Sequence, residues 1–180
     1  PTGTGKSLAA LVPLLAELFE PFESTTWSTS PLRLLIVAPL KALVNDAARS
    51  LTGQLEKLHA MMHCEATLPR ITVRTGDASA AERRRLRNDP PEILLTTPES
   101  LSVLLAQSWA AELFANLTHV VIDEVHALAG NKRGADLGMS LERLSHLSNR
   151  LRRVGLSATA TPLETAARWL AGAERDCTIV

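Results

Sequence analysis

The chain has 180 residues with 19 basic and 19 acidic side chains, so its formal net charge is zero and overall charge gives no argument for nucleic-acid binding. This length suits one domain with a substantial core, and 46% apolar with 21% charged residues is ordinary for a globular protein. No apolar run approaches the roughly 20 residues of a membrane span, and no signal peptide is visible. The isolated Cys64 and Cys177 indicate a reducing compartment, so we expect a cytoplasmic protein.

Apolar, β-branched runs alternate with amphipathic stretches along the chain, which predicts a parallel α/β sheet. In chain order we expect a helix over 7–19, a surface loop over 20–31, a strand over 32–38 and a helix over 40–59. A strand over 71–74, an Arg-rich helix over 79–87, a strand over 93–96 and a helix over 98–107 follow. The last expected elements are a strand over 119–122, a helix over 136–147, a strand over 152–156, a helix over 163–170 and the start of a strand at 177–180. No repeat or linker divides these elements, so residues 1–180 are expected to form one domain.

A glycine-rich segment, Gly3-Thr4-Gly5-Lys6-Ser7, directly precedes the first expected helix. Backbone N–H groups of such a loop bind phosphate oxygens, while the lysine reaches the β- and γ-phosphates and the hydroxyl reaches Mg²⁺. The full loop pattern needs a residue one position before Pro1, and no initiator Met is present, so we expect a fragment whose first strand is missing. Taken alone, the segment is also compatible with a chance glycine turn.

Two adjacent carboxylates, Asp123 and Glu124, follow the buried strand expected at 119–122 and precede Val125 and His126. The carboxyl end of a parallel strand is where open α/β sheets bind ligands. Because two neighbouring anions repel each other, this pair predicts a bound cation. Taken alone, it could also be the acidic start of a helix. A phosphate loop and a cation-binding pair together indicate a nucleoside triphosphatase.

Three further segments lie where an expected strand passes into a helix, at the same edge as the two motifs above. They contain Pro39 and Lys41, then Thr75-Gly76-Asp77, then Thr97-Pro98 with Ser100. A capped helix N-terminus can contact phosphate, although each segment alone is more simply read as ordinary capping. Together they favour a track for a polyanion. The hydroxyls of Ser157 and Thr159, after a later strand, could bridge to Asp123 or His126.

The Arg-rich stretch at 82–87 is open to two readings, an exposed helix face or a contact with a nucleic-acid backbone.

In this order, the segments GTGKS, PLKAL, TGD, TTPESL, DEVH and LSAT resemble the first RecA-like domain of a superfamily 2 helicase. Within this superfamily, the residues in and around these segments are similar to those of the Lhr (large helicase-related) branch, near the Ski2-like helicases. The resemblance covers nearly the whole chain. The resemblance implies a RecA-like P-loop NTPase fold, with a mostly parallel sheet and helices on both faces. It implies ATP and Mg²⁺ as cofactors and 3′ to 5′ translocation on nucleic acid, with a role in DNA repair. It also implies a monomer that binds single-stranded DNA or an RNA/DNA hybrid, and a second RecA-like domain elsewhere in the full-length chain.

The residue roles follow from the same resemblance. Gly3, Thr4, Gly5, Lys6 and Ser7 would bind the nucleotide, and Ser7 and Asp123 would hold Mg²⁺. Glu124 would orient or deprotonate the attacking water, and Asp123 and His126 would complete the catalytic set. His126, Ser157 and Thr159 would couple hydrolysis to strand binding. The nucleic-acid backbone would be contacted by Pro39, Lys41, Thr75, Gly76, Asp77, Thr97, Pro98 and Ser100.

Without the second domain, we expect the fragment to bind nucleotide weakly and to hydrolyse it poorly or not at all. Two alternatives stay open. One is a nucleic-acid-stimulated ATPase that remodels complexes without unwinding. The other is a non-catalytic nucleic-acid-binding module, whose expected sign would be the loss of Lys6 or Glu124, and both residues are present. The sequence does not distinguish DNA from RNA.

Overall fold

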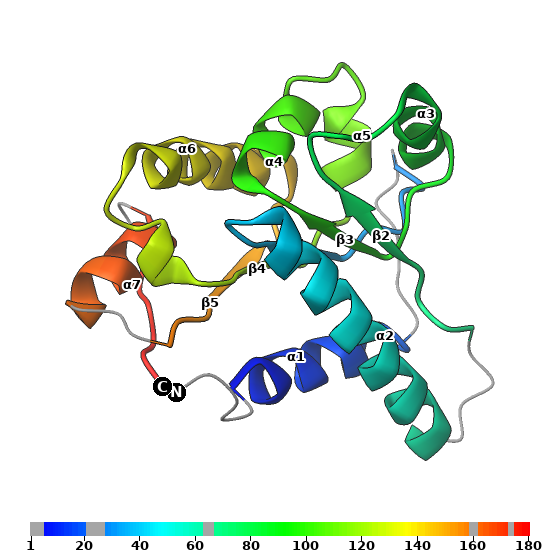
Figure 1. Ribbon diagram of the computed structural model, residues 1–180, viewed down its shortest axis with the longest axis horizontal. Coiled ribbons are helices and arrows are strands. Elements are labelled where there is room, and N and C mark those ends of the chain that lie inside the picture. Colours follow the sequence, from blue (N-terminus) through cyan, green and yellow to red (C-terminus); the bar gives the residue numbers. More distant parts are fainter. Residues whose placement is uncertain (1–5, 21–27, 63–66, 159–161, 173–174) are drawn as a thin grey trace.

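A parallel β-sheet forms the centre of the computed structural model, which describes residues 6–20, 28–62, 67–158, 162–172 and 175–180 (Figure 1). Its five strands lie in the order β2-β3-β1-β4-β5, and every neighbouring pair is parallel. The strands are β1 (Leu34–Val37), β2 (Ile71–Arg74), β3 (Ile93–Thr96), β4 (His119–Ile122) and β5 (Arg152–Gly155). The predicted α/β class is therefore confirmed.

The strands end level with one another, because the register aligns their last residues across the whole sheet. Val37 lies opposite both Thr96 and Ile122, Arg74 lies opposite Thr96, and Gly155 lies opposite Ile122. All strand-to-helix connections therefore leave from one edge, the edge at which open α/β sheets bind their ligands.

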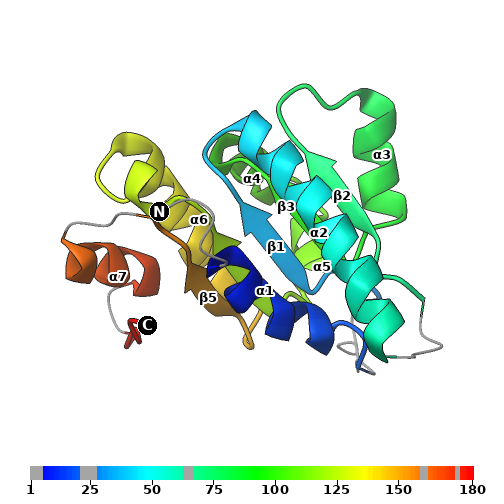
Figure 2. The same cartoon turned by 60° about the horizontal axis from the view of Figure 1, so that its bottom comes forward.

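Helices cover both faces of the sheet (Figures 1 and 2). One face carries α1 (Lys6–Glu17) and α2 (Lys41–Met62), and the other carries α4 (Pro98–Leu105), α5 (Ala110–Phe114) and α6 (Lys132–Leu147). The sheet edges are flanked by α3 (Ala80–Asn88) near β2 and α7 (Leu163–Ala171) against β5. No helix within the described ranges is long and apolar enough to cross a membrane.

Each face of the sheet has its own apolar core, and the central strand β1 contributes to both. Leu34 and Ile36 pack on the α1–α2 side, whereas Leu35 and Val37 pack on the α4–α6 side. Because both faces are covered, the strand reads as a continuous apolar run rather than an alternating one.

Two sequence expectations were wrong. The described residues 175–180 are exposed and form no strand, so the strand predicted at 177–180 is absent there; a short apolar run needs a neighbouring strand to pair with, which periodicity cannot supply. The helix predicted to begin at residue 136 begins at Lys132, because Asn131 caps it: the Asn131 Oδ1 accepts a hydrogen bond of 3.1 Å from the Gly134 N–H.

The short helix α5 was also not predicted, and α2 continues to Met62, beyond the expected end at residue 59. With five residues, α5 is too short to show a helical period of apolar positions.

Candidate nucleotide and nucleic-acid site

The turn after β4 carries Asp123 and Glu124, and neighbouring strands hold it on both sides. The Asp123 N–H donates to the Val37 carbonyl at the end of β1 (2.9 Å), and the Val125 N–H donates to the Leu156 carbonyl after β5 (2.9 Å). Between these two contacts Glu124 adopts a left-handed conformation, with φ 51° and ψ 49°. It is the one non-glycine residue of the described ranges with a positive φ. Such a conformation costs a side chain about 1–2 kcal/mol and is typical of functional sites.

The two carboxylates are half-buried. Burial raises the pKa of Asp123, and the neighbouring negative charge of Glu124 raises it further, while a hydrogen bond of 2.9 Å from the Glu124 N–H to Asp123 Oδ1 opposes the shift. The Oε2 atom of Glu124 is buried without a hydrogen-bond partner among the described residues. Oxygen ligands of this kind, with negative charge that burial destabilises, fit a hard divalent cation such as Mg²⁺.

His126 connects the carboxylates to the segment that follows β5. Its Nδ1 atom lies 2.9 Å from Ser157 Oγ, with hydrogen-bond geometry, and 3.2 Å from Glu124 Oε2. The structure therefore places the Ser157 hydroxyl against His126, as the sequence predicted, and places Glu124 beside the same ring nitrogen. Thr159, predicted to take part with Ser157, lies outside the described residues.

Lys6 and Ser7 are the first two residues of α1. Gly3, Thr4 and Gly5 lie outside the described residues, so the phosphate loop itself is a prediction from sequence. A helix start directly after the glycines agrees with the expected arrangement, in which the helix N-terminus faces a phosphate.

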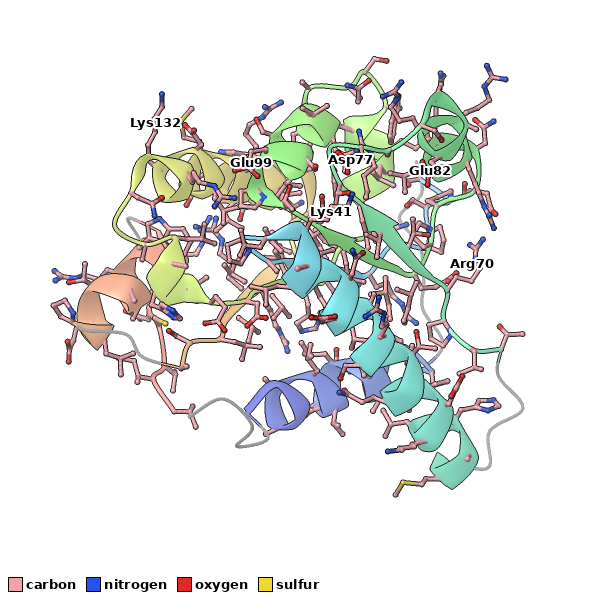
Figure 3. The ribbon with its side chains drawn as sticks, viewed as in Figure 1. Lys41, Arg70, Asp77, Glu82, Glu99 and Lys132 are labelled. Carbon is pink, nitrogen blue, oxygen red and sulfur yellow. The ribbon has the colours of Figure 1, made fainter. Side chains whose placement is uncertain are left out.

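The predicted nucleic-acid residues lie at the ends of β1, β2 and β3. Lys41 starts α2, and its ammonium group forms an ion pair with Asp77, which follows β2; both side chains are exposed (Figure 3). The partner holds the pKa of Asp77 below its usual value through a hydrogen bond from Lys41. Gly76 is exposed and Thr75 is buried.

At the end of β3, ordinary helix capping occupies the hydroxyls that were expected to face a nucleic acid. Thr97 caps α4: its Oγ1 accepts a hydrogen bond from the Ser100 N–H (3.4 Å) and lies 3.2 Å from the Ser100 Oγ. Thr97 and Ser100 are both buried, and Pro98 occupies the first turn. A contact between this segment and a strand remains a prediction.

Arg133 at the start of α6 joins two of these segments, and sequence reasoning assigned it no role. Its Nε donates to Glu99 Oε1 on α4 (2.6 Å), and its Nη2 donates to the Pro39 carbonyl before α2 (2.7 Å). The neighbouring Gly134 lets the start of α6 approach the turn after β4, because a Cβ there would lie 1.9 Å from the Leu128 carbonyl oxygen. The sequence signal was the Lys132-Arg133-Gly134 triplet, but a partner 94 residues away cannot be inferred from it.

Comparison with known proteins identifies the family. The family model of the DEAD/DEAH box helicases matches residues 1–167. Curated relatives include the ATP-dependent helicase Lhr-Core of Methanothermobacter thermautotrophicus, 42% identical over the whole of this chain and 22% of the relative. Another is the Lhr helicase/uracil glycosylase of Escherichia coli, 43% identical over the whole chain and 12% of the relative. The chain thus spans about a fifth or less of these relatives' lengths.

A solved structure, that of Mycobacterium smegmatis helicase Lhr bound to single-stranded DNA and AMP-PNP, superimposes on the whole chain with a TM-score of 0.88 and 40% identity, covering 22% of that protein. The DEAD-box helicase Mss116 bound to single-stranded RNA shares the fold, with a TM-score of 0.73 at 21% identity over 94% of this chain and 33% of that one. The strand order, the carboxylate turn and these matches lead to one conclusion: the chain belongs to the DEAD/DEAH box helicase family, and it is similar to Lhr-type helicases over its whole length.

Proposed function

We propose that this chain is the ATP-binding RecA-like domain of an ATP-dependent helicase that moves along single-stranded nucleic acid. The observation that carries the proposal is the turn after β4, where Glu124 is held in a strained conformation and its buried Oε2 accepts no hydrogen bond from the described residues. The likeness to an Lhr structure that contains single-stranded DNA and a nucleotide analogue supports it.

In this proposal ATP binds at the edge of the sheet where the carboxyl ends of the strands are aligned. Gly3, Thr4, Gly5 and Lys6 bind its phosphates, and Ser7 and Asp123 hold Mg²⁺. The ion, when bound, neutralises charge that develops on the phosphate oxygens. Glu124 orients the attacking water and accepts its proton, a role that suits a carboxylate oxygen to which the described residues donate no hydrogen bond.

The hydrogen bond between His126 and Ser157 would transmit a structural change at the nucleotide site to the segment after β5. A change at Glu124 Oε2 acts on the same His126 Nδ1 atom, since the two lie 3.2 Å apart. We propose that this contact, with Thr159, couples hydrolysis to movement on the strand.

The nucleic-acid strand would lie across Pro39 and Lys41, Thr75 to Asp77, and Thr97 to Ser100. These residues would contact the backbone of the nucleic acid rather than its bases. Exposed Lys41 and Gly76 are available for such contacts, and Lys41 can exchange its partner Asp77 for a phosphate. Binding would be largely independent of sequence and would weaken with salt.

Properties of the whole protein are further proposals, because the chain spans 22% of its Lhr-Core relative. They are unwinding, movement in the 3′ to 5′ direction, a role in DNA repair, a monomeric state, a cytoplasmic location, and a second RecA-like domain that completes the ATP cleft. A remodelling ATPase without unwinding activity would use the same site, and strand-separation assays on the full-length protein distinguish the two.

The proposal is tested by measuring ATP hydrolysis by the full-length protein with and without single-stranded DNA. The Lys6→Ala variant should lose ATP turnover, because phosphate binding loses its cation. The exposed Lys57→Ala on α2 removes the same charge elsewhere and should hydrolyse ATP like wild type. Wild-type turnover in Lys6→Ala would contradict the assignment of the phosphate loop.

A further inference from the structure

A basic groove lies between α3, α4 and the end of β2, on the face of the sheet that carries α4 to α6. Figure 1 shows where these elements lie. The volume of the groove is ≈ 550 Å³. The residues that matter here are four arginines, an amide and an aromatic ring: Arg74, Arg83, Arg84, Arg87, Gln107 and Trp109. The established family assignment and the proposed strand track leave this groove without a role.

The lining of the groove carries a net positive charge. None of the described residues that line it is acidic, and neither Arg84 nor Arg87 forms an ion pair within the described part of the chain. Glu82 on the same helix is committed to the N-terminus of α3, where its Oε2 accepts a hydrogen bond of 2.6 Å from the Ser79 N–H.

A second cavity of ≈ 250 Å³ adjoins the groove and shares Arg87, Asn88 and Trp109 with it, but its own arginine differs from those of the groove. It is also lined by an arginine, Arg70, but this side chain pairs with Asp89 and Glu92. The carboxylates satisfy this partly exposed guanidinium within the protein, so Arg70 gives no indication of an anionic ligand.

Arg74 is the buried member of the groove. Only 5% of the residue is exposed; one guanidinium nitrogen donates to the Thr75 carbonyl, and the Nε has no hydrogen-bond partner among the described residues. Burial lowers the pKa of Arg74, and the positive charge of Arg83 lowers it further, while the negative charge of Glu82 partly opposes the shift. A buried guanidinium with a free donor, beside a second guanidinium, is a costly arrangement that an anion would relieve.

We propose that this groove binds a phosphodiester of the nucleic-acid strand as the strand continues past Thr75 to Asp77. Arg74 is adjacent to Thr75 in the chain, so the groove begins where the proposed track reaches the end of β2. The ring of Trp109 and the side chain of Val103, which is 51% exposed, give the groove an apolar wall. Cations beside an aromatic ring suit a nucleotide, whose phosphate is charged and whose base can stack.

This inference rests on the proposed function, since it extends the path of the same strand. Of the two interpretations that the sequence allowed for the Arg-rich stretch at 82–87, it favours contact with a nucleic-acid backbone over a merely exposed helix face. Free phosphate offers the same charge, but it has no use for an aromatic wall or for a groove that continues the track.

The test is the affinity of the full-length protein for a labelled single-stranded DNA, measured by fluorescence anisotropy over a range of salt concentrations. Arg84→Gln with Arg87→Gln should weaken binding roughly tenfold and reduce the salt slope by about 1.4, the value for two lost phosphate contacts on a single strand. The matched control is Arg85→Gln with Arg150→Gln, which removes two exposed arginines that do not line the groove. The control pair should keep the wild-type slope.

The Trp109→Leu variant distinguishes binding of a nucleic-acid strand from binding of a free phosphate ion. Leucine keeps the apolar contact of this half-buried residue with the core but cannot stack on a base, so affinity should fall while the salt slope stays unchanged. Unchanged affinity would overturn the strand assignment in favour of phosphate alone.

Two failures are distinguishable in this experiment. If wild-type protein does not bind single-stranded DNA, the proposed function itself fails. If wild type binds and the Arg84, Arg87 double variant matches its control in affinity and slope, the groove inference alone is overturned.

Discussion

Glu124 occupies the left-handed region, with φ 51° and ψ 49°, where glycine would lie without strain. Its neighbours hold it there: the Asp123 N–H bonds to β1, and the Val125 N–H bonds to the segment after β5. A non-glycine residue at this position therefore lowers the folding stability, but the conformation fixes the position of its carboxylate. Such an exchange is expected where a side chain is kept for its chemistry rather than for folding.

We expect Glu124→Gly to be more stable than Glu124→Ala by up to about 1 kcal/mol. Both remove the carboxylate, but alanine keeps the left-handed strain of about 1–2 kcal/mol, partly offset by the greater freedom of glycine in the unfolded chain. Hydrogen exchange at the amides of β4 in the full-length protein measures this difference. An alanine variant as stable as the glycine variant would show that the turn is not strained.

At the scale of elements, the helices around the site are connected through their first turns. Arg133 at the start of α6 bonds to Glu99 at the start of α4 and to the carbonyl of Pro39 before α2. Three strand-to-helix junctions thus share one side chain. Figure 3 shows Glu99 at the same edge of the sheet as the exposed Lys41–Asp77 pair. A movement of α6 would therefore alter the hydrogen bonds at the starts of α4 and α2.

Arg133→Met should reduce stimulation of ATP hydrolysis by single-stranded DNA several-fold while leaving ATP binding unchanged. The methionine keeps the aliphatic packing but loses both hydrogen bonds. Because the pair with Glu99 is partly exposed, the loss of folding free energy should stay within about 1 kcal/mol. Arg150→Met, another exposed arginine at a distance from the junctions, serves as the control. Equal stimulation in the two variants would show that Arg133 does not link the site to the strand.

For the whole molecule, the sequence was enough to predict the alternation of strands and helices, the single parallel sheet and the carboxylates after β4. These depend on local patterns, such as the apolar run Val120-Val121-Ile122 followed by Asp123 and Glu124. Long-range contacts were beyond it: neither the reach of Arg133 to Pro39 nor the position of Arg74 in a basic groove has a local signal. The conformation of Glu124 was also not predictable, because two neighbouring strands impose it.

Folding stability of the domain should fall as the pH decreases below about 6.5, the usual pKa of histidine. Burial at the start of β4 lowers the pKa of His119, so between the folded-state and unfolded-state pKa values the unfolded chain binds more protons than the folded one. His119→Gln should reduce this loss, and the exposed His146→Gln should not. The urea midpoint of the full-length protein at several pH values measures it; identical pH profiles in the two variants would contradict the assignment.

The central claim, that Glu124 activates water at an ATP site formed at the level edge of the sheet, is tested most directly by single-turnover hydrolysis in the Glu124→Gln variant. In the full-length protein with single-stranded DNA present, this variant should bind ATP as wild type does and hydrolyse it at least about 100-fold more slowly, the usual contribution of a general base. The exposed Glu56→Gln on α2 should hydrolyse ATP at the wild-type rate. Wild-type hydrolysis by Glu124→Gln would contradict the account.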